Sequence, residues 1–229
     1  MGEIAGGALA VAATIAVFAA AQRLYRRSRI LLLNPVLVAI VVLIVALRAL
    51  GVDYEAYDRG GRVLSYFLGP AVVALGVPLA AQWEEIRRRA RSILVSIAAG
   101  SVTGVLAAAG TAALLGASPS IVRTMAPRSV TTPIAMGVAA KVGGIPSLTA
   151  VIVVATGVLG AVIGPTLLRA IGVRSRTALG LALGSASHGI GTARALEEGE
   201  VEGATAGLAI GLMGVATAIL APILLRLLF

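Results

Sequence analysis

The chain has 229 residues, of which 59% are hydrophobic and 13% are charged, and its mean hydropathy is +1.00. A soluble domain is nearer half apolar and a quarter charged, so this composition excludes an ordinary soluble protein. Aromatic residues make up only 3%, which argues against a nucleic-acid-binding surface despite the formal charge of +9. Such a charge instead suits anchoring at the cytoplasmic side of a membrane, and it also favours an anionic solute.

The residue types needed for most enzymatic chemistry are scarce. The sequence has no cysteine and a single histidine, so it lacks thiolate nucleophiles, Cys-based metal ligands and an HExxH zinc site. All ten acidic residues fall at predicted segment ends or in connectors. No carboxylate is therefore expected at the middle of the membrane to bind sodium or to relay protons. We predict no enzyme activity, no cofactor and no metal site.

Apolar runs of roughly 20 residues, the length that crosses about 30 Å of hydrocarbon, recur along the chain. The first predicted span runs from about Ile4 to Leu24, and the second begins near Ile30. A third segment covers Val63–Trp83, and a fourth span covers Ser92–Leu115. The third segment is expected to be broken by its glycines and prolines, which are Gly69, Pro70, Gly76 and Pro78.

The second half of the sequence repeats this order. RALGV at Arg48–Val52 returns as RAIGV at Arg169–Val173, and LGPAVVALGVPLAAQWEE from Leu68 aligns without gaps with LGSASHGIGTARALEEGE from Leu183. The sequence thus predicts an all-α polytopic membrane protein of about eight segments. These form two homologous four-element repeats, residues 1–117 and 118–229, each with a broken third element. The repeats are parallel if all segments cross, and inverted if the broken ones are re-entrant hairpins.

A polar cluster interrupts the otherwise apolar run Arg123–Pro146. Proline disfavours helix in the residue before it, so helix should stop near Pro127 and restart near Pro133. The start of a helix presents free N–H groups and a partial positive charge, and Arg128 adds a full charge, which is typical of an anion site. A loop cap at the membrane surface is the alternative. The candidate anion-binding residues are Arg128, Ser129, Thr131 and Thr132.

His188 is the only histidine and lies in GSASHGIGTAR, where Gly184 and Gly191 are expected to break the helix. It is the one side chain inside a predicted segment that titrates near neutral pH, so it is the candidate for proton coupling. A histidine that merely hydrogen-bonds a neighbouring helix is the alternative, and Arg194 also fits an interfacial anchor. The candidate substrate-binding residues of this segment are Ser185, Ser187, His188, Gly189, Thr192 and Arg194.

Four stretches together resemble the LrgB/CidB family, which includes the C-terminal half of the plastid glycolate/glycerate transporter. They are Asn34-Pro35, LGPAVVALGVPLAAQ from Leu68, MAPRSVTTPIA from Met125 and GSASHGIGTARA from Gly184. The resemblance covers essentially the whole chain. Arg128 stands where many members are expected to have lysine, and Ala80-Ala81 replaces a more polar or aromatic pair, which changes the expected shape of a pocket.

The resemblance implies two different functions. Some members are associated with small carboxylates, and Gly/Pro-broken segments in corresponding repeats are typical of secondary transporters. We therefore expect alternating-access transport of small 2-hydroxy or 2-keto monocarboxylates, of the glycolate, glycerate, pyruvate and lactate class, by proton coupling or anion exchange. The alternative is a holin-like or antiholin-like protein that regulates murein hydrolase export and lysis, or a subunit active only with an LrgA/CidA-like partner. An integral, multi-pass location in a bacterial inner or plasma membrane is expected in each case, and a homo-oligomer stays open.

Overall fold

The computed structural model of the protein describes residues 2–28, 30, 33–67, 70, 73, 76–81 and 83–228, and these residues form helices and no strand. The chain divides into two compact units, Met1–Ala74 and Leu75–Phe229. Each unit is described by itself. The predicted repeat boundary at residue 117 falls inside the second unit, in the turn between two of its helices, and the repeats stay a prediction.

Among the residues that the structure describes, the first unit has helices α1, α2 and α3, and α1 packs against both of the others. They are α1 (Gly2–Ser28), α2 (Pro35–Ala49) and α3 (Tyr54–Tyr66). Asn34 starts α2, because its side-chain oxygen accepts hydrogen bonds from the N–H groups of Val36 (2.9 Å) and Leu37 (3.3 Å). The Thr14 and Tyr57 hydroxyls are 2.7 Å apart and join α1 to α3.

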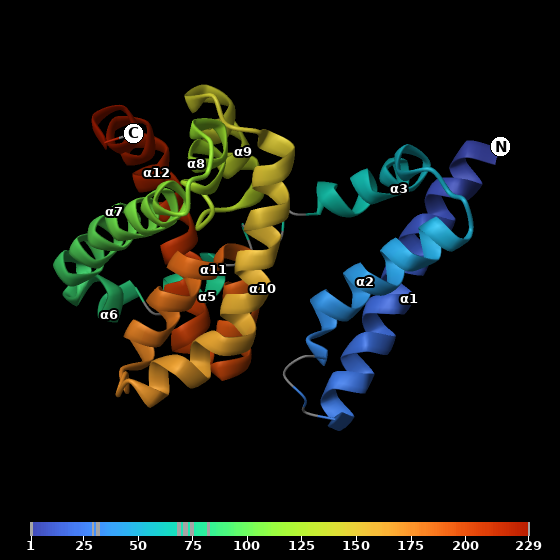
Figure 1. Ribbon diagram of the computed structural model, residues 1–229. Helices are drawn as coiled ribbons and strands as arrows, with labels where there is room; N and C mark the ends of the chain where they lie inside the picture. Colours follow the sequence, from blue (N-terminus) through green and yellow to red (C-terminus); the bar gives the residue numbers. More distant parts are fainter. Residues whose placement is uncertain are drawn as a thin grey trace. The chain divides into compact units, whose positions relative to one another are not determined.

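The second unit holds the remaining described helices, which Figure 1 labels. They are α5 (Gly76–Ala81), α6 (Trp83–Arg88), α7 (Ala90–Leu114), α8 (Pro119–Met125), α9 (Thr132–Val142), α10 (Pro146–Ala170), α11 (Arg176–Glu198) and α12 (Glu200–Leu228). Helices α7, α10 and α12, together with Gly7–Ser28 of α1, are the four described helices that are long and apolar enough to cross a membrane. The sequence thus predicts eight membrane segments, which is more than the four spans found among the described residues.

The predicted segment Val63–Trp83 is divided among several elements. Helix α3 ends at Tyr66, and Pro78 lies within α5. The expected break at Gly76 stays a prediction, because residues 74 and 75 directly before it lie outside the described residues. The expected break at Gly69 lies outside the described residues, and Pro70 beside it has helical backbone.

Helices α8 and α9 form a hairpin whose two outer ends lie at the same end of the second unit. Thr124, near the end of α8, accepts a hydrogen bond from the Ile145 N–H (2.8 Å), and the Thr149 hydroxyl donates to the Thr124 carbonyl (3.1 Å). These bonds tie α8 to the start of α10. Helix α9 ends nearby at Gly143, whose φ of 81° closes the helix. Figure 1 shows α8, α9 and the C-terminus at the same end, which we call the α8–α9 end.

Helix α11 is also a hairpin, and it enters from the opposite end, which we call the α11 end. His188 has φ 42° and ψ −132°, so the helix turns sharply there. Arg169 at the end of α10 pairs with Glu198 at the end of α11, and Arg176 at the start of α11 pairs with Glu202 at the start of α12. Both ends of α11 therefore lie beside the end of α10, and the turn at His188 is buried within the bundle.

The expected helix breaks at Gly184 and Gly191 are thus corrected to a single break at His188. A Cβ atom at Gly184 would lie 2.7 Å from the Ala206 Cα atom in α12, and one at Gly191 would lie 2.5 Å from the Ser187 Cβ atom. Both glycines lie within helical turns, and both are needed because neighbouring atoms approach closely. They permit packing of α11 against α12 and of its two limbs against each other.

Replacement of Gly184 by alanine tests this packing. The added methyl group meets backbone atoms of α12, which cannot rotate away, so we expect Gly184→Ala to lower the free energy of unfolding by about 1–3 kcal/mol. Gly110→Ala in α7 is the matched control, because nothing lies within 4 Å of a Cβ atom there. Unfolding of the purified variants in detergent measures both effects, and equal stabilities would contradict the close approach.

Candidate functional site

The turn between α8 and α9, residues 126–131, is the first break in the bundle. Helix α8 ends at Met125 and α9 begins at Thr132, with Thr131 as the residue that precedes its first turn. The side chain of Thr131 makes no capping hydrogen bond. Inside the turn, the N–H groups of Arg128 and Val130 donate to the carbonyls of Met125 (3.2 Å) and Pro127 (3.3 Å). These bonds hold a compact non-helical tip, which we call the first tip.

Arg128 is the unusual residue of the first tip. Its side chain is half-buried and forms no ion pair or hydrogen bond with any described residue. Ser129 beside it is 9% exposed, and its hydroxyl lies over Gly104 of α7, 3.3 Å from where a Cβ atom would be. A guanidinium that is withdrawn from water without a carboxylate partner has all its hydrogen-bond donors available.

The second tip is the turn of α11 at His188. The imidazole Nε2 lies 2.9 Å from the Val153 carbonyl of α10, and the Thr192 hydroxyl donates to the His188 carbonyl (3.0 Å). The imidazole fills the space above Gly157, where a Cβ atom would lie 2.6 Å from Nε2. Ser187 is 1% exposed, and its hydroxyl has no partner among the described residues. This tip therefore also holds an unsatisfied polar group.

Val153 connects the two tips. Its side chain belongs to a buried apolar cluster with Val130 of the first tip and Ala135 of α9, and its carbonyl faces His188 of the second tip. Counted at 1.5 Å per residue, Val153 lies about 10 Å below the start of α10. Two hairpins from opposite ends thus reach the same part of α10. Three of the cavities in the described part of the chain have volumes of about 340–440 Å³, and none of these three is lined by Arg128, Ser187 or His188.

The other predicted site residues lie in different surroundings. Thr132 and Ser185 are half-buried, whereas Gly189 is exposed and has open space where a side chain would begin. Arg194 lies on the returning limb of α11, away from the turn, where it pairs with Glu197 (3.0 Å) and Glu198. The structure therefore buries Ser129, Ser187 and His188 at the tips, whereas it engages Arg194 in ion pairs at the α11 end.

The sequence of the chain matches that of a known protein family. The model of the LrgB-like family matches residues 14–227. The chain belongs to the LrgB family. It is 36% identical to the uncharacterized protein YwbG of Bacillus subtilis, over 96% of this chain and 97% of that protein. It is 35% identical to the antiholin-like protein LrgB of Bacillus cereus, over 83% of each. No solved structure matches.

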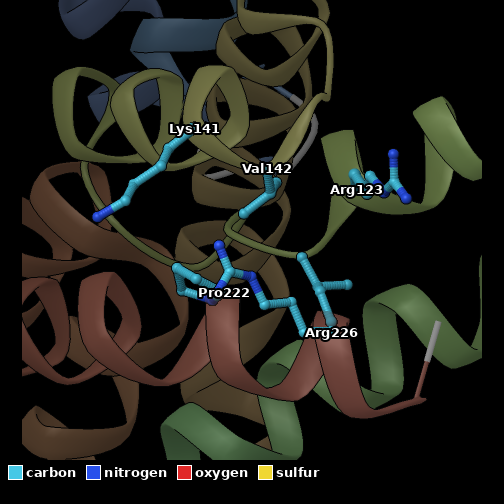
Figure 2. Close-up of a pocket in the computed structure, with 6 residues that line it drawn as sticks. Arg123, Lys141, Val142, Pro222 and Arg226 are labelled. Carbon is cyan, nitrogen blue, oxygen red and sulfur yellow. The ribbon is translucent and has the colours of Figure 1, made fainter.

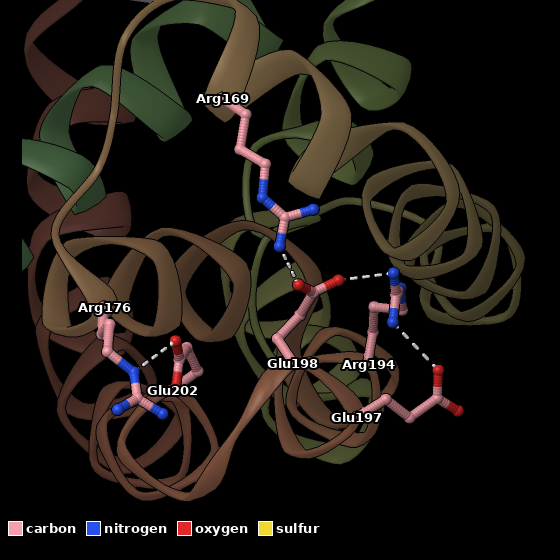
Figure 3. A network of polar contacts seen from close by, with 6 residues as sticks. All are labelled: Arg169, Arg176, Arg194, Glu197, Glu198 and Glu202. Atoms are coloured by element: carbon pink, nitrogen blue, oxygen red, sulfur yellow. Dashed lines mark hydrogen bonds and ion pairs between the residues drawn. The ribbon is translucent and has the colours of Figure 1, made fainter.

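The long apolar helices and the family agree that this LrgB-family chain is an integral, multi-pass membrane protein. Its charged network at the α11 end is a feature that the sequence patterns did not reveal. Figure 3 shows the Glu198 carboxylate between Arg169 and Arg194, with Glu197 on the outer side of Arg194 and the pair Arg176–Glu202 apart from them. The arginines gather at residues 169–176 and the glutamates at residues 197–202, and these two clusters of opposite charge are the available sequence signal.

This network closes the base of the α11 hairpin. Glu198 is 9% exposed and contacts an arginine from α10 and another from its own helix, so it joins two elements. Glu197 is 56% exposed and pairs only with Arg194, on the same helix. In this LrgB-family protein, Glu198 therefore contributes more to holding the hairpin together than Glu197 does.

The pair offers a matched comparison. We expect Glu198→Gln to lower the free energy of unfolding by about 1.5–3 kcal/mol, because a charge-assisted contact between α10 and α11 and a second one within α11 are lost. Glu197→Gln should change it by at most about 1 kcal/mol, as is usual for an exposed pair. Denaturation of both variants in the same detergent gives the difference. An equal loss in the two variants would remove the hairpin-closing role of Glu198.

Proposed function

We propose that this protein is an antiholin-like membrane protein that regulates murein hydrolase export and cell lysis. Support comes from the family match over residues 14–227 and from the 35% identity to a relative whose name is antiholin-like protein LrgB. The sequence analysis placed carboxylate transport first, and the relatives' names favour its alternative. No catalytic step belongs to this function.

The surface of the long helices suits an interaction within the membrane. Between 28% and 33% of the α7, α10 and α12 spans is buried within the chain, so most of each span is available to lipid or to another membrane protein. Apolar helices that remain uncovered associate with other helices through close packing. We therefore propose a small LrgA/CidA-like membrane protein as the partner.

Reconstitution tests this function directly. In sealed liposomes loaded with dyes of several sizes, a holin-like LrgA/CidA-type protein is expected to cause leakage. Addition of this protein should slow that leakage several-fold, whereas the protein alone should cause none. An unrelated polytopic membrane protein at the same ratio of protein to lipid is the control for crowding. Leakage that is unchanged by the protein would reject the antiholin-like function.

A second candidate function, a carrier for a small monocarboxylate, is favoured by one observation. Arg128 is a half-buried cation without an acidic partner among the described residues, on a tip of non-helical backbone. Broken elements with free polar groups in the middle of a membrane bundle are typical of transporter binding sites. In this carrier, Arg128 holds the carboxylate, Ser129 and Thr131 add hydrogen bonds, and His188 exchanges the coupled proton.

Counterflow in proteoliposomes separates this candidate from the first. We expect saturable exchange of labelled glycolate, glycerate or pyruvate, and Arg128→Gln should reduce it at least tenfold, the factor that corresponds to about 1.4 kcal/mol of lost carboxylate binding. Arg128→Lys, which keeps the charge, should retain part of the exchange. Arg48→Gln, at the exposed end of α2, is the control for removal of a charge. Counterflow that is absent in the wild-type protein rejects the carrier and leaves the antiholin-like function unaffected.

A further inference from the structure

A cavity of about 440 Å³ lies at the α8–α9 end of the second unit, and none of its lining residues belongs to either tip. Three basic side chains from three different helices line it: Arg123 of α8, Lys141 of α9 and Arg226 of α12. Figure 2 shows these residues around the cavity together with Val142 and Pro222. Arg123 and Arg226, which are about a hundred positions apart in the sequence, thus place like charges around the same cavity.

The charges at this cavity are not neutralised within the described chain. No acidic residue lines the cavity, and none of the three basic side chains forms an ion pair with a described residue. Each lies in the last turn of its helix, where the helix dipole favours a cation. That local effect explains one charge per helix, but it does not explain why three of them line one cavity without an acidic residue, since like charges repel.

The position of Arg123 is fixed by the backbone beneath it. Gly143, which ends α9, has φ 81°, and a Cβ atom there would lie 3.3 Å from the Arg123 Nη1 atom. The absence of a side chain at Gly143 therefore leaves room for the guanidinium beside the turn between α9 and α10. The turn thus admits one of the basic side chains that line the cavity.

The remaining lining of the cavity is apolar. Val142, Pro222 and Leu225 complete it, and Leu225 is 4% exposed. Immediately beyond, at the end of the α12 span, Leu227 and Leu228 are 73% and 58% exposed. Cations beside apolar surface at the end of a membrane-crossing helix match a ligand that carries a negative head and a hydrocarbon chain.

We propose that this cavity binds the phosphate group of an anionic phospholipid. Arginine and lysine together suit phosphate, because the guanidinium donates in a fork and the ammonium acts as a compact charge. A free phosphate ion presents the same chemistry, so the experiment must separate the two sources. The site uses none of the tip residues, and it stands independently of the proposed function.

Native mass spectrometry of the full-length protein in detergent tests the site. Phosphatidylglycerol and phosphatidylcholine with identical chains are titrated, and the first lipid that binds is followed. We expect clear preference for phosphatidylglycerol, and a weakening of its binding on the order of 100-fold in the variant Arg123→Gln/Lys141→Gln/Arg226→Gln, at roughly a factor of five per charge. The variant Arg123→Lys/Lys141→Arg/Arg226→Lys should bind nearly as the wild type does.

A matched control removes the same charge elsewhere. Arg26→Gln/Arg27→Gln/Arg48→Gln also deletes three exposed cations from the last turns of apolar helices, but none of them lines the cavity. This variant should keep the preference for phosphatidylglycerol. Equal weakening in both triple variants would overturn the proposal, because general attraction to anionic lipid would then explain the binding. Equal binding of the two lipids by the wild-type protein would also overturn it.

Competition identifies the source of the phosphate. Excess inorganic phosphate, with chloride at equal ionic strength as the control for screening, is added to the complex with lipid. Displacement by phosphate alone supports recognition of the phosphate group in solution. Retention of the lipid, together with loss of binding in the first triple variant, supports recognition of a headgroup that is held with its chain. Displacement by chloride to the same extent contradicts a defined phosphate site.

Discussion

Lipid supplies no hydrogen bonds, so backbone that leaves the helix inside a membrane protein must be satisfied by the protein itself. Both tips meet this demand with local bonds. At the first tip, N–H groups donate to carbonyls three residues earlier in the chain, from Arg128 to Met125 and from Val130 to Pro127. At the second, the Thr192 hydroxyl donates to the carbonyl of His188 itself. The arrangement of hairpins in the second unit depends on these few bonds.

Close packing of small residues then makes room for the returning chain. Along α10, Gly157, Gly160 and Gly164 lie against His188, Ser187 and Leu183 of α11, so one helix offers a flat face to the first limb of the other. On the opposite side of α11, glycines receive α12 at similarly short range. A hairpin placed between two spans in this way loses little van der Waals contact, and the ion pairs at the α11 end close its base.

The sequence predicts those features that depend on neighbouring residues. Pro127 and Pro133 restrict the backbone of the residues before them. Helix α8 accordingly ends just before Pro127, and α9 begins just before Pro133. Gly184 was interpreted wrongly, because its role is decided by Ala206 in another helix. The sequence left open whether the broken segment of the second half crosses the membrane or forms a hairpin, since closure of the α11 hairpin depends on Arg169 and Glu198, which are 29 residues apart. Apolar length alone also cannot separate a span from the limb of a hairpin, which explains the excess of expected segments.

The distribution of charge distinguishes the two ends of the second unit and bears on function. At the α11 end, glutamates pair with arginines from two helices, so those cations are engaged in holding the fold. At the α8–α9 end and at Arg128, cations lack acidic partners among the described residues, so they remain available to anions from outside the chain. A carrier has to break the contact between His188 and Val153 whenever α11 moves against α10. A regulator of a partner protein can leave that contact intact, and this difference in required motion separates the two functions physically.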